Sequence, residues 1–220
     1  MNTLRSALTL WVALLLLVGC SSPPVPPDWQ SNALASLKSF TQAYLTGNTR
    51  LAELDFAAVR HDIASTGRSD LSARAELVRC AVRSASLAFD DCPAYRALAL
   101  DAQPPERAYA AFLSGQWSGL DSALLAPHYR AVVQAGPEQT ALLQAIPDPL
   151  SRLVAASVLL KKGLISPVDI QVALDTASAQ GWRRPLLAWL GVQLQRATAA
   201  GDLEAASALQ RRIDLVLSAL

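Results

Sequence analysis

The sequence has few of the residues that most often bind metals or transfer protons in active sites. Only two histidines occur in 220 residues, His61 and His128, and neither has a cysteine nearby. Zinc sites need about three or four ligands, usually at short spacings, so we expect no metal site and no cofactor. His61 lies beside Asp62 on the polar side of its predicted helix, which favours a solvated histidine over the alternative, a catalytic base. The motifs G-x-S-x-G, H-E-x-x-H and the P-loop are missing, and we expect no enzymatic activity.

Strand patterns and an excess of one charge are missing as well. No stretch alternates apolar and polar residues for long enough to predict a β-strand, while alanine and leucine are abundant and favour helices. Basic and acidic side chains nearly balance, 19 against 18. Binding of nucleic acid depends on an excess of basic residues, so we expect no nucleic-acid partner.

The first hydrophobic run has the features of an export signal. Arg5 supplies a positive charge, an apolar stretch follows from Ala7 to Val18, and Gly19 is small. The apolar stretch is too short to span a bilayer, which takes about 20 residues, so residues 1–19 are predicted to be a signal peptide. The mature chain would then lose its one extra positive charge.

The end of this run, "LVGC", resembles the lipobox of bacterial lipoproteins. The resemblance implies that Cys20 becomes the first residue, carries diacylglycerol on its sulfur and is acylated on its amino group. Several acyl chains together anchor a protein stably to a membrane. A plain signal peptide, or an N-terminal membrane anchor that contains a cysteine, is the alternative.

A proline-rich segment follows Cys20. Residues 20–27 are predicted to be the lipidated cysteine and an extended tether, because proline favours polyproline II at about 3.1 Å per residue. Ser21 stands where Asp retains enteric lipoproteins in the inner membrane. By that resemblance we expect anchoring in the outer membrane, facing the periplasm.

Two further cysteines, Cys80 and Cys92, remain in the chain. Thiols outside the inner membrane tend to oxidise, so we expect a structural disulfide between them. Two buried free thiols are one alternative. A redox pair is another, although such pairs usually have the closer C-x-x-C spacing.

Residues 28–220 are predicted to form an all-α periplasmic domain of about ten helices in antiparallel hairpins, with proline at helix starts and glycine at helix ends. One face of the first predicted helix is expected to carry Leu34, Leu37, Thr41 and Leu45. Phe89 is expected to lie on the apolar face of the third predicted helix. Ser166 and Asp169 are predicted to form a capping box. The predicted helices are 28–46, 49–66, one from Asp70, 93–100, 104–113, short ones from Pro127 and Pro137, 149–163, 166–181, 185–199 and one from about 203 to the end.

Two segments resemble tetratricopeptide (TPR) hairpins: "AYLTGNTRLAELDFAAV" and "ATAAGDLEAASALQRR". Each places a small residue four before a large apolar one, Ala52 before Phe56 and Ala205 before Leu209. The resemblance implies that Ala52 packs near Tyr44 and that Phe56 inserts between neighbouring helices. No regular 34-residue period joins the two segments, and generic helical hairpins packed in one globule remain the alternative.

The remaining polar and aromatic candidates are predicted to be structural. Arg60 and Asp62 lie opposite Phe56 on their helix and are expected to face solvent, and Trp182 and Trp189 are expected in the core. The basic pairs are predicted to be solvated helix ends, with a partner-binding patch as the alternative. These pairs are Lys161-Lys162, Arg183-Arg184 and Arg211-Arg212.

These features favour a membrane-anchored protein that binds or scaffolds a periplasmic or envelope protein. One alternative is an envelope enzyme acting on peptidoglycan or another polymer, which would need paired carboxylates. Its candidate acids are Asp90-Asp91 and Asp101 with Glu106, although loop or capping roles explain them better. A purely structural lipoprotein is a third hypothesis.

Overall fold

The computed structural model describes residues 26–135 and 142–218, and this part of the chain is helical with no strand. The predicted all-α fold is therefore confirmed. The signal peptide, Cys20, residues 21–25 of the tether and Pro137 lie outside the described residues. The elements are α2 (Asp28–Leu45), α3 (Thr49–Ala64), α4 (Ser69–Ala85), α5 (Pro93–Arg96), α6 (Pro104–Ser114), the 3-10 helix η1 (Ser122–Leu124), α7 (Pro127–Gln134), α8 (Pro149–Lys161), α9 (Pro167–Ala179), α10 (Arg183–Ala199) and α11 (Leu203–Leu217).

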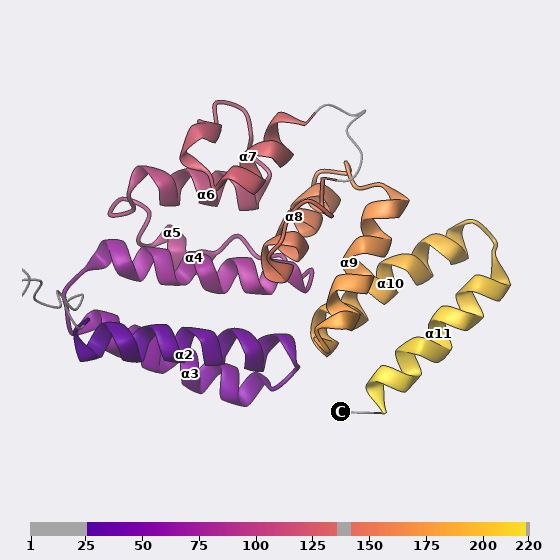
Figure 1. Cartoon of the computed structure of the whole chain (residues 1–220), viewed down its shortest axis with the longest axis horizontal. Helices are drawn as coiled ribbons and strands as arrows, with labels where there is room; N and C mark the ends of the chain where they lie inside the picture. The colour runs from indigo at the N-terminus through magenta and orange to yellow at the C-terminus, as the bar shows by residue number, and fades with distance from the viewer. Residues whose placement is uncertain (1–25, 136–141, 219–220) are drawn as a thin grey trace, which may run out of the picture.

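Helix α4 lies at the centre of the arrangement (Figure 1). The antiparallel pair α2 and α3 covers one side of it, while α5 and α6 cover the other. Helix α8 packs against α4 as well, and α9, α10 and α11 follow, each in contact with the helix before it. Most of these helices thus bury apolar residues against their neighbours, as short connections between helices require.

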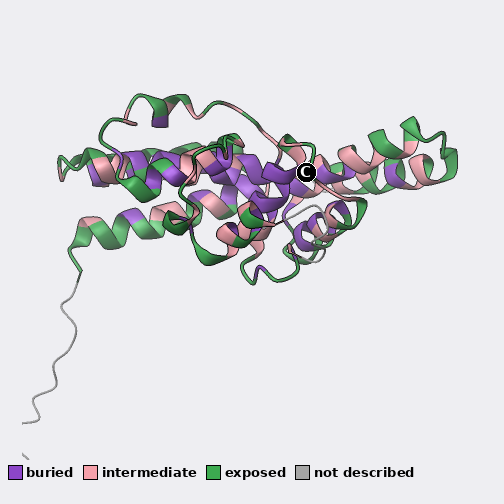
Figure 2. Cartoon of the chain, turned by 90° about the horizontal axis from the view of Figure 1, so that it is seen from above, coloured by how far each residue is buried: buried purple, intermediate pink, exposed green. Residues whose placement is uncertain are grey.

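The core is concentrated in the middle of the molecule, and the α10–α11 end is more exposed (Figure 2). All residues from Leu153 to Leu159 in α8 are buried, whereas Leu209 is the one buried residue of α11. The bulkiest fully buried side chains include Trp189, Phe40 and Phe112. The core therefore holds α4 and α8 more firmly than the C-terminal helix.

Two predicted core residues are exposed instead. Leu34 has 60% of its surface exposed, because the buried stripe of α2 runs through Ala33, Leu37 and Phe40. A one-residue offset rotates a side chain by about 100° around a helix. The second is Phe89, which is 43% exposed because α4 ends at Ala85 before reaching it.

Ala52 and Phe56 are both buried, as their predicted packing requires. The centres of the Phe56 and Phe40 rings lie 4.9 Å apart, and the guanidinium groups of Arg60 and Arg79 lie 5.0 and 4.9 Å from the centre of the Phe56 ring. Arginine against an aromatic face is a favourable cation–π contact.

Arg60 is exposed, as predicted, but it also has a partner on another helix that the sequence did not reveal. Its side chain is half exposed, but its Nε donates to Oε1 of Glu76 at 2.6 Å, and the Glu76 side chain is only 8% exposed. The long arginine side chain reaches across from α3 to α4, which the position of Arg60 on its own helix does not reveal. Arg60 therefore neutralises a buried carboxylate.

The prediction that Arg183 and Arg184 form a solvated helix end was wrong. Arg183 Nε donates to the Thr46 carbonyl at 3.0 Å, and Arg184 Nε donates to the Tyr44 carbonyl at 2.6 Å. These carbonyls lie at the C-terminal end of α2, where the helix dipole favours cations. The two arginines thus attach the start of α10 to the α2–α3 turn.

Candidate functional site

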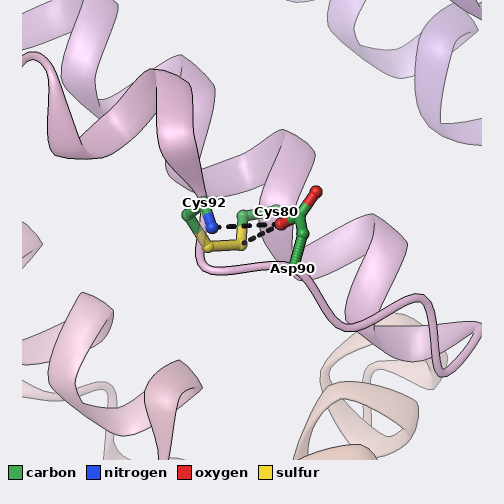
Figure 3. Close-up of side chains that lie close together, drawn as sticks. All are labelled: Cys80, Asp90 and Cys92. Carbon is green, nitrogen blue, oxygen red and sulfur yellow. Dashed lines mark hydrogen bonds between the residues drawn. A yellow bond between two sulfur atoms is a disulfide. The ribbon is translucent and has the colours of Figure 1, made fainter.

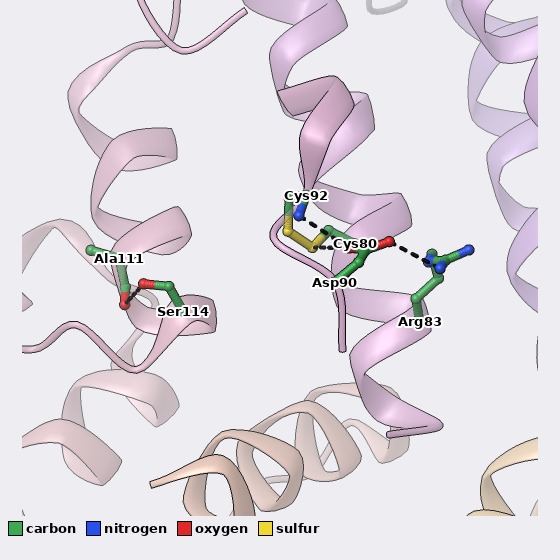
Figure 4. Close-up of a disulfide and its surroundings, with 6 residues drawn as sticks. All are labelled: Cys80, Arg83, Asp90, Cys92, Ala111 and Ser114. Atoms are coloured by element: carbon green, nitrogen blue, oxygen red, sulfur yellow. Dashed lines mark hydrogen bonds and ion pairs between the residues drawn. A yellow bond between two sulfur atoms is a disulfide. The ribbon is translucent and has the colours of Figure 1, made fainter. Parts of the chain in front are cut away.

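A furrow runs between α4 on one side and α5 and α6 on the other. Cys80, Asp90, Cys92 and Tyr95 line two adjoining hollows, of about 240 and about 470 Å³. The larger hollow extends along α6 and reaches the end of α8. Figure 4 shows Ala111 and Ser114 of α6 across from the Cys80–Cys92 pair.

The chain reverses direction sharply between α4 and α5 to form one wall of the furrow. Leu87 and Cys92 both have positive φ angles, 57° and 46°, a conformation that is costly for residues other than glycine. Pro93 then begins α5. Such costly backbone conformations persist where the surrounding contacts impose them.

A disulfide joins Cys80 of α4 to Cys92 of the loop, as the sequence analysis predicted, with the two Cα atoms 5.7 Å apart. Asp90 lies beside it (Figure 3). Its Oδ1 accepts from the Cys92 backbone N–H at 3.1 Å, and its Oδ2 lies 2.9 Å from Nη2 of Arg83. The disulfide and this ion pair together fix the loop against α4.

Cys80, Asp90 and Cys92 form the one group of three metal-ligand residue types within residues 26–135 and 142–218, with ligand atoms within 4.8 Å of one another. Metals bind the thiolate form of cysteine. The two sulfur atoms are bonded to each other here, so they present no thiolate. In this oxidised form the cluster is a structural brace.

Cationic side chains are gathered along the larger hollow. Arg96 of α5, Arg107 of α6 and Lys161 at the end of α8 all line it, and all three are exposed. Sequence reasoning missed this group because its members are far apart in the chain. Nothing in the local pattern around any one of them indicates the others.

Tyr95 lies between the two hollows and is buried. Burial raises the pKa of its phenol above the ordinary value, and the positive charge of Arg107 opposes that rise. The phenol is therefore neutral at physiological pH. It can contribute an apolar ring and one hydroxyl group to the furrow.

The carboxylates that an enzyme would need are not brought together as a free pair. Asp90 is paired with Arg83, and Glu106 is buried and paired with Arg74 at a distance of 2.7 Å. Asp91 and Asp101 are exposed on loops. The arrangement of these four acids is that of structural or solvated groups.

The histidines and tryptophans lie elsewhere. His61 is exposed on α3, as predicted, and His128 is partly buried on α7 against Tyr129. Burial lowers the pKa of His128 below its ordinary value. Trp182 and Trp189 are buried, as predicted, and the indole of Trp189 donates to the Ala85 carbonyl at 3.3 Å.

The basic pair Lys161-Lys162 at the end of α8 matches the predicted solvated helix end only in part. Lys162 Nζ donates to the Gly115 carbonyl at 2.9 Å and lies 4.5 Å from the centre of the Trp117 ring. It therefore ties α8 to the end of α6, whereas Lys161 is exposed at the furrow. Arg211 and Arg212 are exposed on α11.

Comparison with models of protein families found no match, and comparisons with curated proteins and with solved structures found none either. Among the helices within the described ranges, none combines the length and the apolar character that crossing a membrane takes. Ideas about function therefore depend on the sequence motifs and on the furrow.

Proposed function

We propose that the protein is a bacterial lipoprotein, anchored through Cys20 in the outer membrane and facing the periplasm, whose helical domain binds another envelope protein. The "LVGC" motif supports the anchor. The paired helices at each end, α2–α3 and α10–α11, are the segments that resemble TPR hairpins, a family whose stacked hairpins bind peptides and partner helices.

The furrow between α4 and α6 carries the binding proposal. It is built on helices that pack through the core, and its loop wall is fixed by the disulfide and by the Arg83–Asp90 pair. A surface held in place before binding loses less conformational entropy when a partner docks. The mixture of apolar and charged lining residues is suited to a protein segment.

The anchor is tested by replacing Cys20 with alanine. The unprocessed precursor of Cys20→Ala should accumulate in the inner membrane, and mass spectrometry of the wild-type protein should find acyl chains on its N-terminal cysteine. A mature wild-type protein with no acyl chains would overturn the proposed anchor.

The binding role is tested by photocrosslinking in cells. A photoreactive amino acid at Gln116, which lines the furrow, should crosslink to a discrete protein partner. The same amino acid at Ser207, exposed on α11, is the matched control. Equal products at both positions, or none at Gln116, would contradict a binding role for the furrow.

A further inference from the structure

Three cations at the larger hollow of the furrow have no acidic partner. Arg96, Arg107 and Lys161 form no ion pair within the part of the chain that the structure describes, whereas Arg60, Arg68, Arg74, Arg79 and Arg83 all do. Arg107 donates one hydrogen bond to the carbonyl of Ala102. Most of the hydrogen-bonding capacity of these three side chains is therefore open to a ligand.

The acidic residues of the same hollow do not balance them. Asp90 is compensated by Arg83 and by the Cys92 N–H group, which leaves exposed Asp91 as the one uncompensated acid of the lining. Three cations thus face one carboxylate. This local excess contrasts with a chain whose basic and acidic residues number 19 and 18.

Apolar residues line the same hollow. Ala99, Ala110 and Leu113 line it together with Tyr95 and the disulfide. Arginine recognises carboxylates through paired N–H donors, and apolar side chains favour an apolar ligand surface beside them. The lining therefore suits a segment that carries both carboxylates and apolar side chains.

We propose that this hollow binds a carboxylate-bearing, partly apolar segment of the partner protein, with Arg96, Arg107 and Lys161 as its ligands. The inference rests on the proposed binding function and adds the chemistry of the partner. Three separate cations match several carboxylates, so acidic side chains are the proposed source, and a chain end is tested as the alternative.

The test measures fluorescence anisotropy with the mature lipoprotein in non-ionic detergent and three labelled decapeptides. The first alternates Glu and Leu and has an amidated end. The second replaces Glu by Gln and has a free carboxylate end, and the third has Gln and an amidated end. We expect the first to bind at least about tenfold more tightly than the third, a difference of about 1.4 kcal/mol. Tight binding of the second peptide but not of the first would overturn the assignment to acidic side chains.

The variant for this test is the double substitution Arg96→Gln and Lys161→Gln, because neither side chain has a hydrogen bond within residues 26–135 and 142–218. Nζ of Lys161 lies 5.8 Å from the centre of the Phe89 ring, and losing this contact with an exposed side chain should leave the fold intact. The double variant should lose about tenfold in affinity for the peptide that binds. Arg211→Gln with Arg212→Gln, an exposed pair on α11, is the matched control and should bind as the wild type does.

Two further results would overturn the inference. Equal affinity for all three peptides, or no binding to any of them, would show that carboxylates are not recognised. An equal loss of peptide affinity in the double variant of Arg96 and Lys161 and in the double variant of Arg211 and Arg212 would show a general charge effect. In either case a Gln116 crosslink that persists would leave the binding function standing, so the two proposals fail separately.

Discussion

Nε of Arg60 lies 2.6 Å from Oε1 of Glu76 and joins α3 to the central helix α4. Arg60→Ala should lower the free energy of unfolding by about 1–3 kcal/mol, because it leaves a buried carboxylate without its charged donor. Urea unfolding measures the change. Asp62→Ala on the same helix should cost less than about 0.5 kcal/mol, and equal effects of the two variants would show that the ion pair does not contribute.

The interface between α2 and α3 should tolerate little change in volume. Ala52 is fully buried, so Ala52→Leu should overpack it and cost about 1–3 kcal/mol. Phe56→Ala should leave a cavity and cost about 3–5 kcal/mol. Leu54 is 61% exposed on the same helix, and Leu54→Ala is the control in the same urea experiment. Costs for Ala52→Leu and Phe56→Ala as small as that of the control would contradict the packing.

Loss of the disulfide should destabilise the fold. Cys80→Ser should reduce stability by about 3 kcal/mol and lower the midpoint of thermal unfolding by several degrees. The double variant Cys80→Ser, Cys92→Ser should match the single variant, because one bond is lost in both. Two reactive thiols in denatured, non-reduced wild-type protein would show that the bond does not form in the cell.

The start of α4 should respond to acid. Arg68 donates to both oxygens of Asp70, at 2.8 and 2.7 Å, and lowers the pKa of Asp70 to about 2. Because the folded-state pKa is depressed, this pair stabilises the fold above about pH 4, and the effect disappears as the pH falls towards 2. In Arg68→Gln the pKa of Asp70 should rise towards 3.8, as followed by NMR of the carboxyl carbon. Arg50→Gln should leave it unchanged.

The attachment of α10 to the α2–α3 turn should depend on Arg184. Its Nη2 donates to the Thr49 hydroxyl at 2.7 Å, and its guanidinium lies 4.3 Å from the centre of the Tyr44 ring. Arg184→Ala should speed hydrogen exchange of the first amides of α10 and the last amides of α2. Arg211→Ala, exposed on α11, should leave both segments as they are, and unchanged exchange in Arg184→Ala would rule out the attachment.

Helix positions could be predicted because local signals determine them. Ser166 and Asp169 form the predicted capping box, with the Ser166 hydroxyl accepting from the Asp169 N–H at 3.2 Å. Proline begins α5 and α6, as expected from its position in the sequence. Such signals act within a few residues, so one sequence is enough to find them.

The furrow and the arginine contacts could not be predicted in this way. Arg96, Arg107 and Lys161 come together through the packing of three helices, and Arg60 reaches Glu76 on another helix. A periodic pattern shows which face of a helix is apolar, but it does not show which neighbour covers that face or where a long side chain ends. The cysteine pair was predictable because only two cysteines remain once Cys20 is assigned to the proposed lipid anchor.

The contacts of residues 182–184 with the α2–α3 turn have a kinetic consequence. The bond from the Trp182 indole to Gln42 and the bond from Arg184 to Tyr44 each join positions 140 residues apart. Closing so long a loop is slow compared with pairing two adjacent helices. The α2–α3 hairpin can therefore assemble from local contacts soon after folding begins. The carbonyls at the C-terminal end of α2 stay uncovered until α10 arrives. Refolding should therefore show a fast helical phase followed by slower docking of the two distant regions.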